Sequence, residues 1–244
     1  MQLSKRLQAV ADSVTKGNRV ADVGCDHAYI SINLIQQNIA PHVIAMDVNK
    51  GPLERGRENI ERLGFSDKVE TRLSDGLNKL NPGEVDTILI AGMGGALTVR
   101  ILEEGLTSVK KCKELVLQPQ SELFFVRKFI EQIEFEIIAE QMLIDDGKYY
   151  TIIKAIPKVP SPMVPGSVTF ENANTTNQEL FYRYGKLLLQ QKDPITKEYL
   201  LKEKNLRLQV IKELNQNLSE NAVIRLKEVQ EELGYIEEGL EYYK

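Results

Sequence analysis

The run Asp22–Ile30, which reads Asp-Val-Gly-Cys-Asp-His-Ala-Tyr-Ile, constrains the fold of this chain more than any other segment. It follows a short apolar stretch at 18–21 that has the character of a buried strand, and it leads into 28–37, whose pattern is helical. A tight glycine turn between a strand and a helix is typical of the ligand-binding edge of a doubly wound sheet. We therefore expect an α/β fold with a ligand site at this turn.

The turn also restricts the ligand. It contains one glycine, Gly24, where a loop that binds a dinucleotide or a phosphate needs three. It carries two acids, Asp22 and Asp26, which would repel a diphosphate. S-adenosyl-L-methionine is a nucleoside with a sulfonium and an amino-acid tail but no phosphate, so it meets both restrictions. The turn therefore predicts this cofactor in preference to NAD.

Strands and helices alternate through the first part of the chain. The apolar patterns predict strands at 19–23, 42–47, 69–73, 85–91 and 114–118, and helices at 2–15, 28–37, 51–63, 96–106 and 122–132. Two more strands, at 135–143 and 148–156, flank the turn signal Asp145-Asp-Gly147. Repeated strand–helix units followed by a hairpin predict a mostly parallel seven-stranded sheet with an antiparallel edge.

The composition changes after residue 157. Residues 158–176 are rich in Pro, Asn and Thr, which predicts a linker. Beyond it, Leu180, Leu187 and Leu188 mark one helix, and Asp193 followed by proline starts a second. Two long apolar stripes joined near 216–219 indicate an antiparallel helical hairpin. We expect a catalytic domain at 1–157, a linker at 158–176 and a coiled-coil-like helical domain at 177–244.

Composition sets broad limits on function. The formal net charge is −4, from 31 Lys+Arg against 35 Asp+Glu, which by itself argues weakly against a nucleic-acid partner. The chain lacks the long apolar run of a membrane span and the basic-then-apolar start of a secretory signal. Cys25 and Cys112 have neither paired nor metal-type spacing. We expect a cytoplasmic protein with no metal and no membrane contact.

Residues at the ends of the predicted strands form a candidate cofactor site. Asp47 ends the second strand, where an acid accepts hydrogen bonds from the two ribose hydroxyls of an adenosine. The Ser74-Asp75-Gly76 turn follows the third strand, where an acid can accept from the exocyclic amine of adenine, although an ordinary turn is an equal alternative. The expected cofactor-binding residues are Asp22, Gly24, Cys25, Asp26, Asp47, Val48, Asn49, Ser74, Asp75, Gly76, Ala91 and Gly92.

The segment 91–95 after the fourth strand lies where the substrate crevice of such a sheet opens. Its three glycines allow a close approach of backbone to ligand. An Asn/Asp-Pro-Pro-aromatic segment, which enzymes that methylate exocyclic amines carry here, is absent, and neither cysteine has the neighbours of a cytosine-C5 nucleophile. The expected substrate-binding residues are Tyr29, Met93, Gly94, Gly95, Gln118 and Pro119.

His27 and Tyr29 lie at the mouth of the first turn. Either ring could stack on an extruded base or hydrogen-bond its edge. The alternative is that His27 caps the helix and Tyr29 packs in the core. For Asp22, the alternative to ligand contact is a buried acid that accepts only from backbone amides.

These motifs together resemble a known family. The segments 22–30, 51–53 (Gly-Pro-Leu), 74–77 (Ser-Asp-Gly-Leu), 90–95 (Ile-Ala-Gly-Met-Gly-Gly), 117–119 (Leu-Gln-Pro) and 146–150 (Asp-Gly-Lys-Tyr-Tyr) occur in the order and spacing of the bacterial tRNA (adenine(22)-N1)-methyltransferases. The resemblance covers about the first 155 residues, and most members carry serine in place of Cys25. It implies a Rossmann-like class I methyltransferase that methylates N1 of an adenine in the D-arm of tRNA.

The residues suit that chemistry. Adenine N1 has a free lone pair and needs no general base, so alignment is the main demand on the site. A carboxylate near the purine would stabilise the charge that methylation leaves on the base and would accept from its exocyclic amine. Asp26 is the first candidate for this catalytic role, with His27 beside it. If Asp26 holds the cofactor ammonium instead, its loss weakens binding and not turnover.

Several alternatives stay open at this stage. The helical tail could bind tRNA and hold the arm open, with the basic side chains between Lys186 and Arg207 gathered on one face. Alternatively, the tail could mediate dimerisation. The chain could also be a nucleotide-binding redox or regulatory module, a non-catalytic partner protein, or a small-molecule methyltransferase whose tail forms a lid.

Overall fold

A computed structural model describes residues 3–159, 175–216 and 219–244 of the chain. The chain divides into two units, residues 1–163 and 164–244, which we describe separately. Most of the expected linker at 158–176 lies outside the described residues, so the domain boundaries given above stay predictions.

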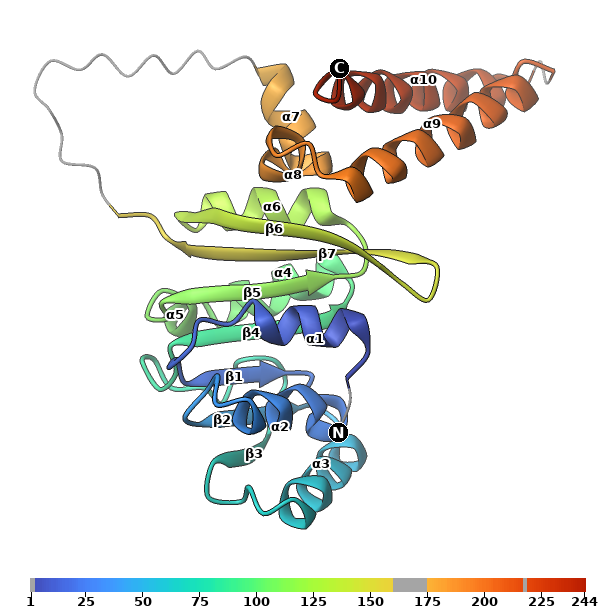
Figure 1. The fold of residues 1–244 in the computed structure, drawn as a ribbon. Helices are drawn as coiled ribbons and strands as arrows, with labels where there is room; N and C mark the ends of the chain where they lie inside the picture. The colour runs from blue at the N-terminus through green and yellow to red at the C-terminus, as the bar shows by residue number, and fades with distance from the viewer. Residues whose placement is uncertain (1–2, 160–174, 217–218) are drawn as a thin grey trace, which may run out of the picture. The chain divides into compact units, whose positions relative to one another are not determined.

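The first unit is built on one seven-stranded sheet (Figure 1) with the strand order β3-β2-β1-β4-β5-β7-β6. The strands are β1 (Val20–Val23), β2 (Val43–Asp47), β3 (Val69–Leu73), β4 (Thr87–Met93), β5 (Glu114–Pro119), β6 (Phe135–Asp145) and β7 (Lys148–Pro157). The first five are mutually parallel, whereas β7 pairs antiparallel with both β5 and β6. The predicted fold class is therefore confirmed.

Helices precede the sheet and follow several of its strands along the chain. They are α1 (Lys5–Asp12), the 3-10 turn η1 (Asp26–Ala28), α2 (Tyr29–Gln36), α3 (Lys50–Arg62), α4 (Gly95–Glu104), α5 (Leu106–Val109) and α6 (Leu123–Gln132). Every residue of β1, β2 and β5 is buried, which is the pattern of a parallel sheet covered on both faces.

Two apolar cores lie on opposite faces of the sheet. On one face, Ile44 and Ile88 pack with Ile101 of α4 and Ile130 of α6. On the other face, the alternate strand residues pack with side chains of α1, α2 and α3, including Val10, Ile32 and Leu53. Because neighbouring strand residues point to opposite faces, the two cores hold the sheet between two layers of helices and leave its carboxyl edge open for a site.

Strand β4 begins and ends two residues later than the sequence predicts, at Thr87 and Met93 instead of 85 and 91. At its start, the carboxylate of Asp86 accepts from the backbone N and the Nε of Arg19, each at 3.0 Å, which fixes Asp86 in the connection before the strand. At its end, Gly92 has φ +80° and forms a bulge that carries the pairing on to Met93. The residues 91–93 therefore close the strand instead of following it.

The second unit consists of α7 (Thr175–Tyr184), α8 (Lys186–Gln190), α9 (Pro194–Leu214) and α10 (Glu220–Glu241). Its small core contains Leu180, Leu189, Leu200 and Ile236. The expected single first helix is two helices, because Gly185 between them has φ +86°. No helix among the described residues has the length and hydrophobicity needed to cross a membrane.

The predicted helical hairpin is present as α9 and α10. Asp193 caps α9, since its Oδ2 accepts from the backbone N of Thr196 at 2.7 Å. Arg207 pairs with Glu232, and Lys204 with Glu237, so the two helices run in opposite directions. Part of the expected connection at 216–219 lies outside the described residues.

Candidate functional site

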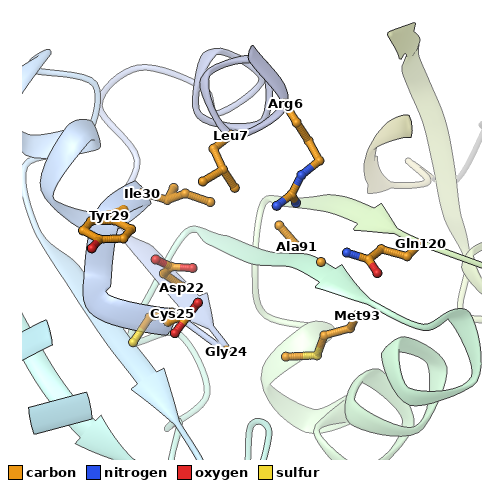
Figure 2. A pocket seen from close by; sticks show the side chains of 12 residues that line it. Arg6, Leu7, Asp22, Gly24, Cys25, Tyr29, Ile30, Ala91, Met93 and Gln120 are labelled. Atoms are coloured by element: carbon orange, nitrogen blue, oxygen red, sulfur yellow. The ribbon is translucent and has the colours of Figure 1, made fainter. Parts of the chain in front are cut away.

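A pocket of about 320 Å³ opens at the carboxyl ends of β1 and β4, with α1 along one wall (Figure 2). This size falls within the range of small-molecule sites. Its lining contains eight residues that the sequence singles out and four others. The lining residues are Arg6, Leu7, Asp22, Gly24, Cys25, Asp26, Tyr29, Ile30, Ala91, Gly92, Met93 and Gln120.

The first turn is fastened to the neighbouring strand. The backbone N atoms of Gly24 and Cys25 both donate to the carbonyl O of Met46, at 2.8 and 3.0 Å, which places the turn beside Asp47. Gly24 has φ +76°, and a Cβ at this position would lie 2.2 Å from Cε of Met93. The backbone conformation therefore favours glycine, whereas the close contact involves only the end of the flexible Met93 side chain, which can move.

The three residues that follow the turn have an uncommon backbone. Asp26, His27 and Ala28 all have positive φ, at 26°, 63° and 59°. Left-handed conformations cost side-chain-bearing residues about 1–2 kcal/mol each. The segment is supported from α3, where Asn59 Nδ2 donates to the carbonyl O of His27 at 3.2 Å and Gly56 leaves room for Ala28. Strain that the surroundings hold in place is a feature of functional sites.

Asp22 is a buried acid that still lines the pocket, with only 2% of its surface exposed. Its Oδ2 accepts from the hydroxyl of Ser31 at 2.6 Å, and the backbone N–H of Ser31 also forms a hydrogen bond with this carboxyl, so Asp22 does not depend on backbone amides alone. Burial raises the pKa of Asp22 to about 6, against the opposing effect of Ser31. A bound cation would favour the ionised form.

Cys25 is buried beneath the turn. Burial, together with the nearby carboxylates of Asp22 and Asp47, raises the pKa of its thiol well above the ordinary value. A thiol that stays protonated is a poor nucleophile. This agrees with the expectation that Cys25 shapes the cofactor turn and performs no chemistry.

Asp26, His27 and Tyr29 form the rim of the site. The Asp26 side chain is 76% exposed, and its Oδ1 lies 3.4 Å from Nε2 of His27. The rings of His27 and Tyr29 stack nearly parallel, with centroids 5.4 Å apart. Tyr29 lines the pocket and is partly exposed, so the alternative that it packs in the core is wrong. His27 is not part of the lining but supports the ring that is.

The other predicted cofactor residues lie at the neighbouring strand ends, outside the pocket lining. Oδ1 of Asp47 accepts from the backbone N of Asn49 at 2.8 Å, and Val48 between them is 58% exposed. Ser74 shapes its turn, because its hydroxyl donates to the carbonyl O of Gly76 at 3.0 Å. Asp75 is exposed at the same edge, with its carboxylate 3.9 Å from Arg100. Asp47, at the end of β2, and Asp75, shortly after β3, are thus acids at the same edge of the sheet as the pocket acids Asp22 and Asp26.

The glycines at the end of β4 and the start of α4 have two different roles. Gly92 lines the pocket, whereas Gly94 and Gly95 lie outside its lining. Gly95 is buried against the β5–α6 connection, where a Cβ would lie 2.5 Å from the carbonyl O of Ser121. The geometry therefore gives Gly95 a packing role at the start of α4, and its predicted contact with substrate stays a prediction.

Gln118 and Pro119 end β5 and are buried outside the lining. Gln118 is fully buried, and its Oε1 accepts from Nη1 of Arg6 on α1. Gln118 thus contacts a side chain that lines the pocket, and its predicted contact with substrate, like that of Pro119, stays a prediction.

Sequence reasoning missed four lining residues, which are Arg6, Leu7, Ile30 and Gln120. Leu7 and Ile30 belong to ordinary apolar stripes, and Gln120 follows a strand end, so none carries a distinctive signal. Arg6 lies in a basic stretch near the N-terminus that is typical of a solvated surface. Only the packing of α1 against the carboxyl edge of the sheet reveals its place.

The charges of the pocket are separated. Figure 2 shows Arg6 reaching from α1 toward Ala91 and Gln120, while Asp22, Cys25 and Tyr29 lie on the side of the first turn. A molecule with a positive and a negative group at one end would match this separation. No cluster of three or more His, Cys, Asp or Glu side chains that could hold a metal occurs among the described residues.

Comparison with known proteins agrees with the fold. Residues 3–153 match the model of a family described as "Methyltransferase domain". The chain is similar to the tRNA (adenine(22)-N(1))-methyltransferase of Bacillus subtilis (strain 168), with 36% identity over 155 residues. That alignment covers 64% of this chain and 65% of the relative's length.

Two solved structures resemble nearly the whole chain. The crystal structure of the B. subtilis M1A22 tRNA methyltransferase TrmK has a TM-score of 0.83 and 27% identity, and the match covers 98% of this chain and 99% of that one. The structure of M. capricolum TrmK in complex with S-adenosyl-homocysteine has a TM-score of 0.80 and 25% identity, with full coverage of both chains.

Proposed function

This chain belongs to the tRNA (adenine(22)-N1)-methyltransferase family, and from that premise we propose that it methylates N1 of adenine 22 in the D-arm of tRNA with S-adenosyl-L-methionine. The observation that carries the proposal is the pocket at the ends of β1 and β4. It joins a turn with one glycine and two acids to a partly exposed aromatic ring, Tyr29. These groups suit a cationic nucleoside on one side and a purine on the other.

The chain's own residues fit the cofactor. Gly24 lines the pocket without a side chain, so its backbone can approach a ligand closely there. Asp22 would hold the ammonium of the amino-acid tail, Asp47 the ribose hydroxyls, and Asp75 the exocyclic amine of the cofactor's adenine. When bound, S-adenosylmethionine supplies an electrophilic methyl group on a sulfonium.

On the substrate side, the site must position a base and tolerate its new charge. N1 of adenine attacks with a free lone pair, so alignment supplies most of the rate enhancement and no base has to remove a proton. Tyr29, supported by the stacked ring of His27, would stack on the purine. The exposed carboxylate of Asp26 would accept from the exocyclic amine and stabilise the positive charge left on the methylated base.

The target atom is on the pairing edge of adenine, so the base must leave its arm of the tRNA, at a cost of a few kcal/mol. We propose that the helical unit offsets this cost by binding the tRNA body. Its basic side chains already have partners, since Lys204 and Arg207 pair with Glu237 and Glu232, so an RNA phosphate would compete with these ion pairs. Dimerisation is the alternative task of this unit. The proposed substrate agrees with a cytoplasmic location, which also stays a prediction.

The test is to incubate the protein with unmodified tRNA and S-adenosylmethionine, locate the methylated nuclease fragment by mass, and identify its methylated nucleoside by chromatography against isomeric methyladenosine standards. We expect 1-methyladenosine in one fragment, at position 22, and none in a control tRNA with guanine at that position. Methylation at another position or on another atom, or the absence of methylation with a fully bound cofactor, would contradict the proposal.

A further inference from the structure

Arg6 is the one lining residue whose charge the proposed function has not used, and it is held from three elements. Its Nη1 donates to Oε1 of Gln118 on β5, and its guanidinium carbon lies 5.3 Å from the ring centroid of Tyr150 on β7. Its backbone N donates to Oδ2 of Asp145, at the end of β6, at 3.0 Å. Three contacts of different kinds fix both the helix and the side chain.

Gln118 is fixed in turn. It is fully buried, and its Nε2 donates to the carbonyl O of Pro119 at 3.2 Å, so its oxygen faces Arg6. Nη1 of the guanidinium is therefore occupied, whereas its Nε and Nη2 form no hydrogen bond within the described part of the chain. A planar group with a fixed orientation loses little freedom when it binds a second planar group.

Among the described residues, Arg6 forms no ion pair with a carboxylate, whereas the acids of the pocket have neighbours of their own. Asp22 accepts from Ser31, and Asp26 contacts His27. Arg6 Nη1 lies instead near Gly92, 3.6 Å from where a Cβ of that residue would be. The pocket thus keeps a cation and two acids apart.

We propose that Arg6 binds the carboxylate of the cofactor's amino-acid tail, across the pocket from Asp22, which would hold its ammonium. This assignment rests on the proposed function, because it takes S-adenosylmethionine as the ligand. A zwitterionic tail matches a pocket with separated charges, and a guanidinium recognises a carboxylate through two parallel hydrogen bonds. A phosphate of the RNA is the competing partner, but Arg6 is partly buried in the same pocket as Asp22 and Gly24.

The test removes the proposed guanidinium–carboxylate interaction first by changing the ligand and then by changing the protein. The ligands are S-adenosylhomocysteine and S-adenosyl-3-thiopropylamine, which is the same molecule without its carboxylate. The proteins are the wild type and Arg6→Met, and dissociation constants are measured by calorimetry with no RNA present. We expect the wild type to prefer the carboxylate ligand about 10- to 100-fold, and Arg6→Met to lose that preference while its affinity for the amine is unchanged.

Two control variants sharpen the result. Arg6→Lys keeps the charge without the planar fork, so it should retain part of the preference. Lys5→Met changes the exposed neighbour on α1 and should behave as the wild type. Thermal unfolding of each variant shows whether α1 still packs on the sheet.

The outcomes separate this assignment from the proposed function. An equal loss of affinity for both ligands would overturn it and leave Arg6 a purely structural role. Unchanged affinities with a higher KM for tRNA would also overturn it, in favour of an RNA phosphate. If the wild type bound neither ligand, the proposed function itself would fail.

Discussion

Two glycine-containing turns lie at the carboxyl edge of the sheet, and they contribute to the pocket in different ways. The turn after β1 keeps its side chains, and Asp26, His27 and Ala28 adopt left-handed backbone conformations to present them. The second turn, at 91–95, spans the end of β4 and the start of α4, and its glycines form a bulge and a close packing contact. The first turn therefore contributes polar and aromatic side chains to the site, and the glycines of the second turn allow close packing of the backbone.

The difference teaches where function and stability are coupled. In the first turn, strain is held by contacts from α3, so a change that relieves the strain also moves functional groups. In the second turn, each glycine has its own steric reason, so neighbouring glycines should respond very differently to the same substitution.

The largest effect is expected from Gly95→Ala in the second turn. Its Cβ would lie 2.5 Å from the carbonyl O of Ser121, and backbone atoms cannot move aside easily. We expect a loss of about 3 kcal/mol in the free energy of unfolding and a fall in Tm of about 10 °C.

The matched control is Gly94→Ala, next to it in the chain. A Cβ there lies 3.3 Å from the hydroxyl Oγ of Ser121, which can rotate, and φ is −65°. We expect a change within about 0.5 kcal/mol. Equal destabilisation of both variants in thermal unfolding would refute the distinct packing role of Gly95.

Asp26→Asn tests whether the first turn performs chemistry. If the exposed carboxylate stabilises charge on the base, kcat should fall about 100-fold, equivalent to about 2.7 kcal/mol, while the affinity for S-adenosylhomocysteine changes little. Single-turnover rates and calorimetry on the same variant measure the two quantities. A weaker affinity with an unchanged rate would assign Asp26 to the cofactor ammonium instead.

Asp22→Asn should produce a pH-dependent change in stability. The folded-state pKa of Asp22, about 6, lies above its ordinary value of 3.8, so the native protein holds a proton that the unfolded chain releases. The stability due to this carboxyl is full below about pH 4 and is lost as the pH rises through 6.

Asparagine does not ionise and can still accept from Ser31. The free energy of unfolding of the variant should therefore exceed that of the wild type by about 2–3 kcal/mol at pH 7.5, since each pKa unit is worth about 1.4 kcal/mol. Near pH 4 the two proteins should be equally stable. Unfolding in denaturant at the two pH values measures the difference, with exposed Asp67→Asn as the control. A stability difference that did not depend on pH would contradict the account of Asp22.

The smallest effect is expected from Ala28→Gly. Ala28 has φ +59° and ψ +28°, which glycine adopts without strain. Relief of that strain offsets the greater flexibility of glycine in the unfolded chain, so the net gain should be at most about 1 kcal/mol. The KM for tRNA should rise as His27 and Tyr29 lose their support. A clear loss of stability would show that the backbone there is not strained.

The sequence predicted most of the fold because buried parallel strands appear as short apolar runs. The strands at 20–23, 43–47 and 69–73 lie within one residue of their predicted limits. The sequence pattern did not reveal interactions between residues that are far apart in the chain. Arg19 fixes Asp86 ahead of β4, and Gly92 bulges at the strand's end, so the strand is shifted. The break at Gly185 depends on a positive φ that helical spacing does not reveal.

The site was predictable where a residue's place follows from a strand end. Asp22, Gly24 and Ala91 line the pocket because parallel strands bring their carboxyl ends to one edge. Arg6 could not be predicted as a pocket residue, because α1 precedes the sheet in the chain and no local sequence signal shows that it packs against that edge. The left-handed residues of the first turn were also invisible, since none of them is glycine.

The central claim is that the pocket is built for a zwitterionic nucleoside and not for a diphosphate. Calorimetric titration of the wild-type protein with S-adenosylmethionine and, separately, with NAD tests it most directly. We expect one molecule of S-adenosylmethionine to bind per chain and no measurable heat with NAD. Saturable binding of NAD with no response to S-adenosylmethionine would contradict the claim.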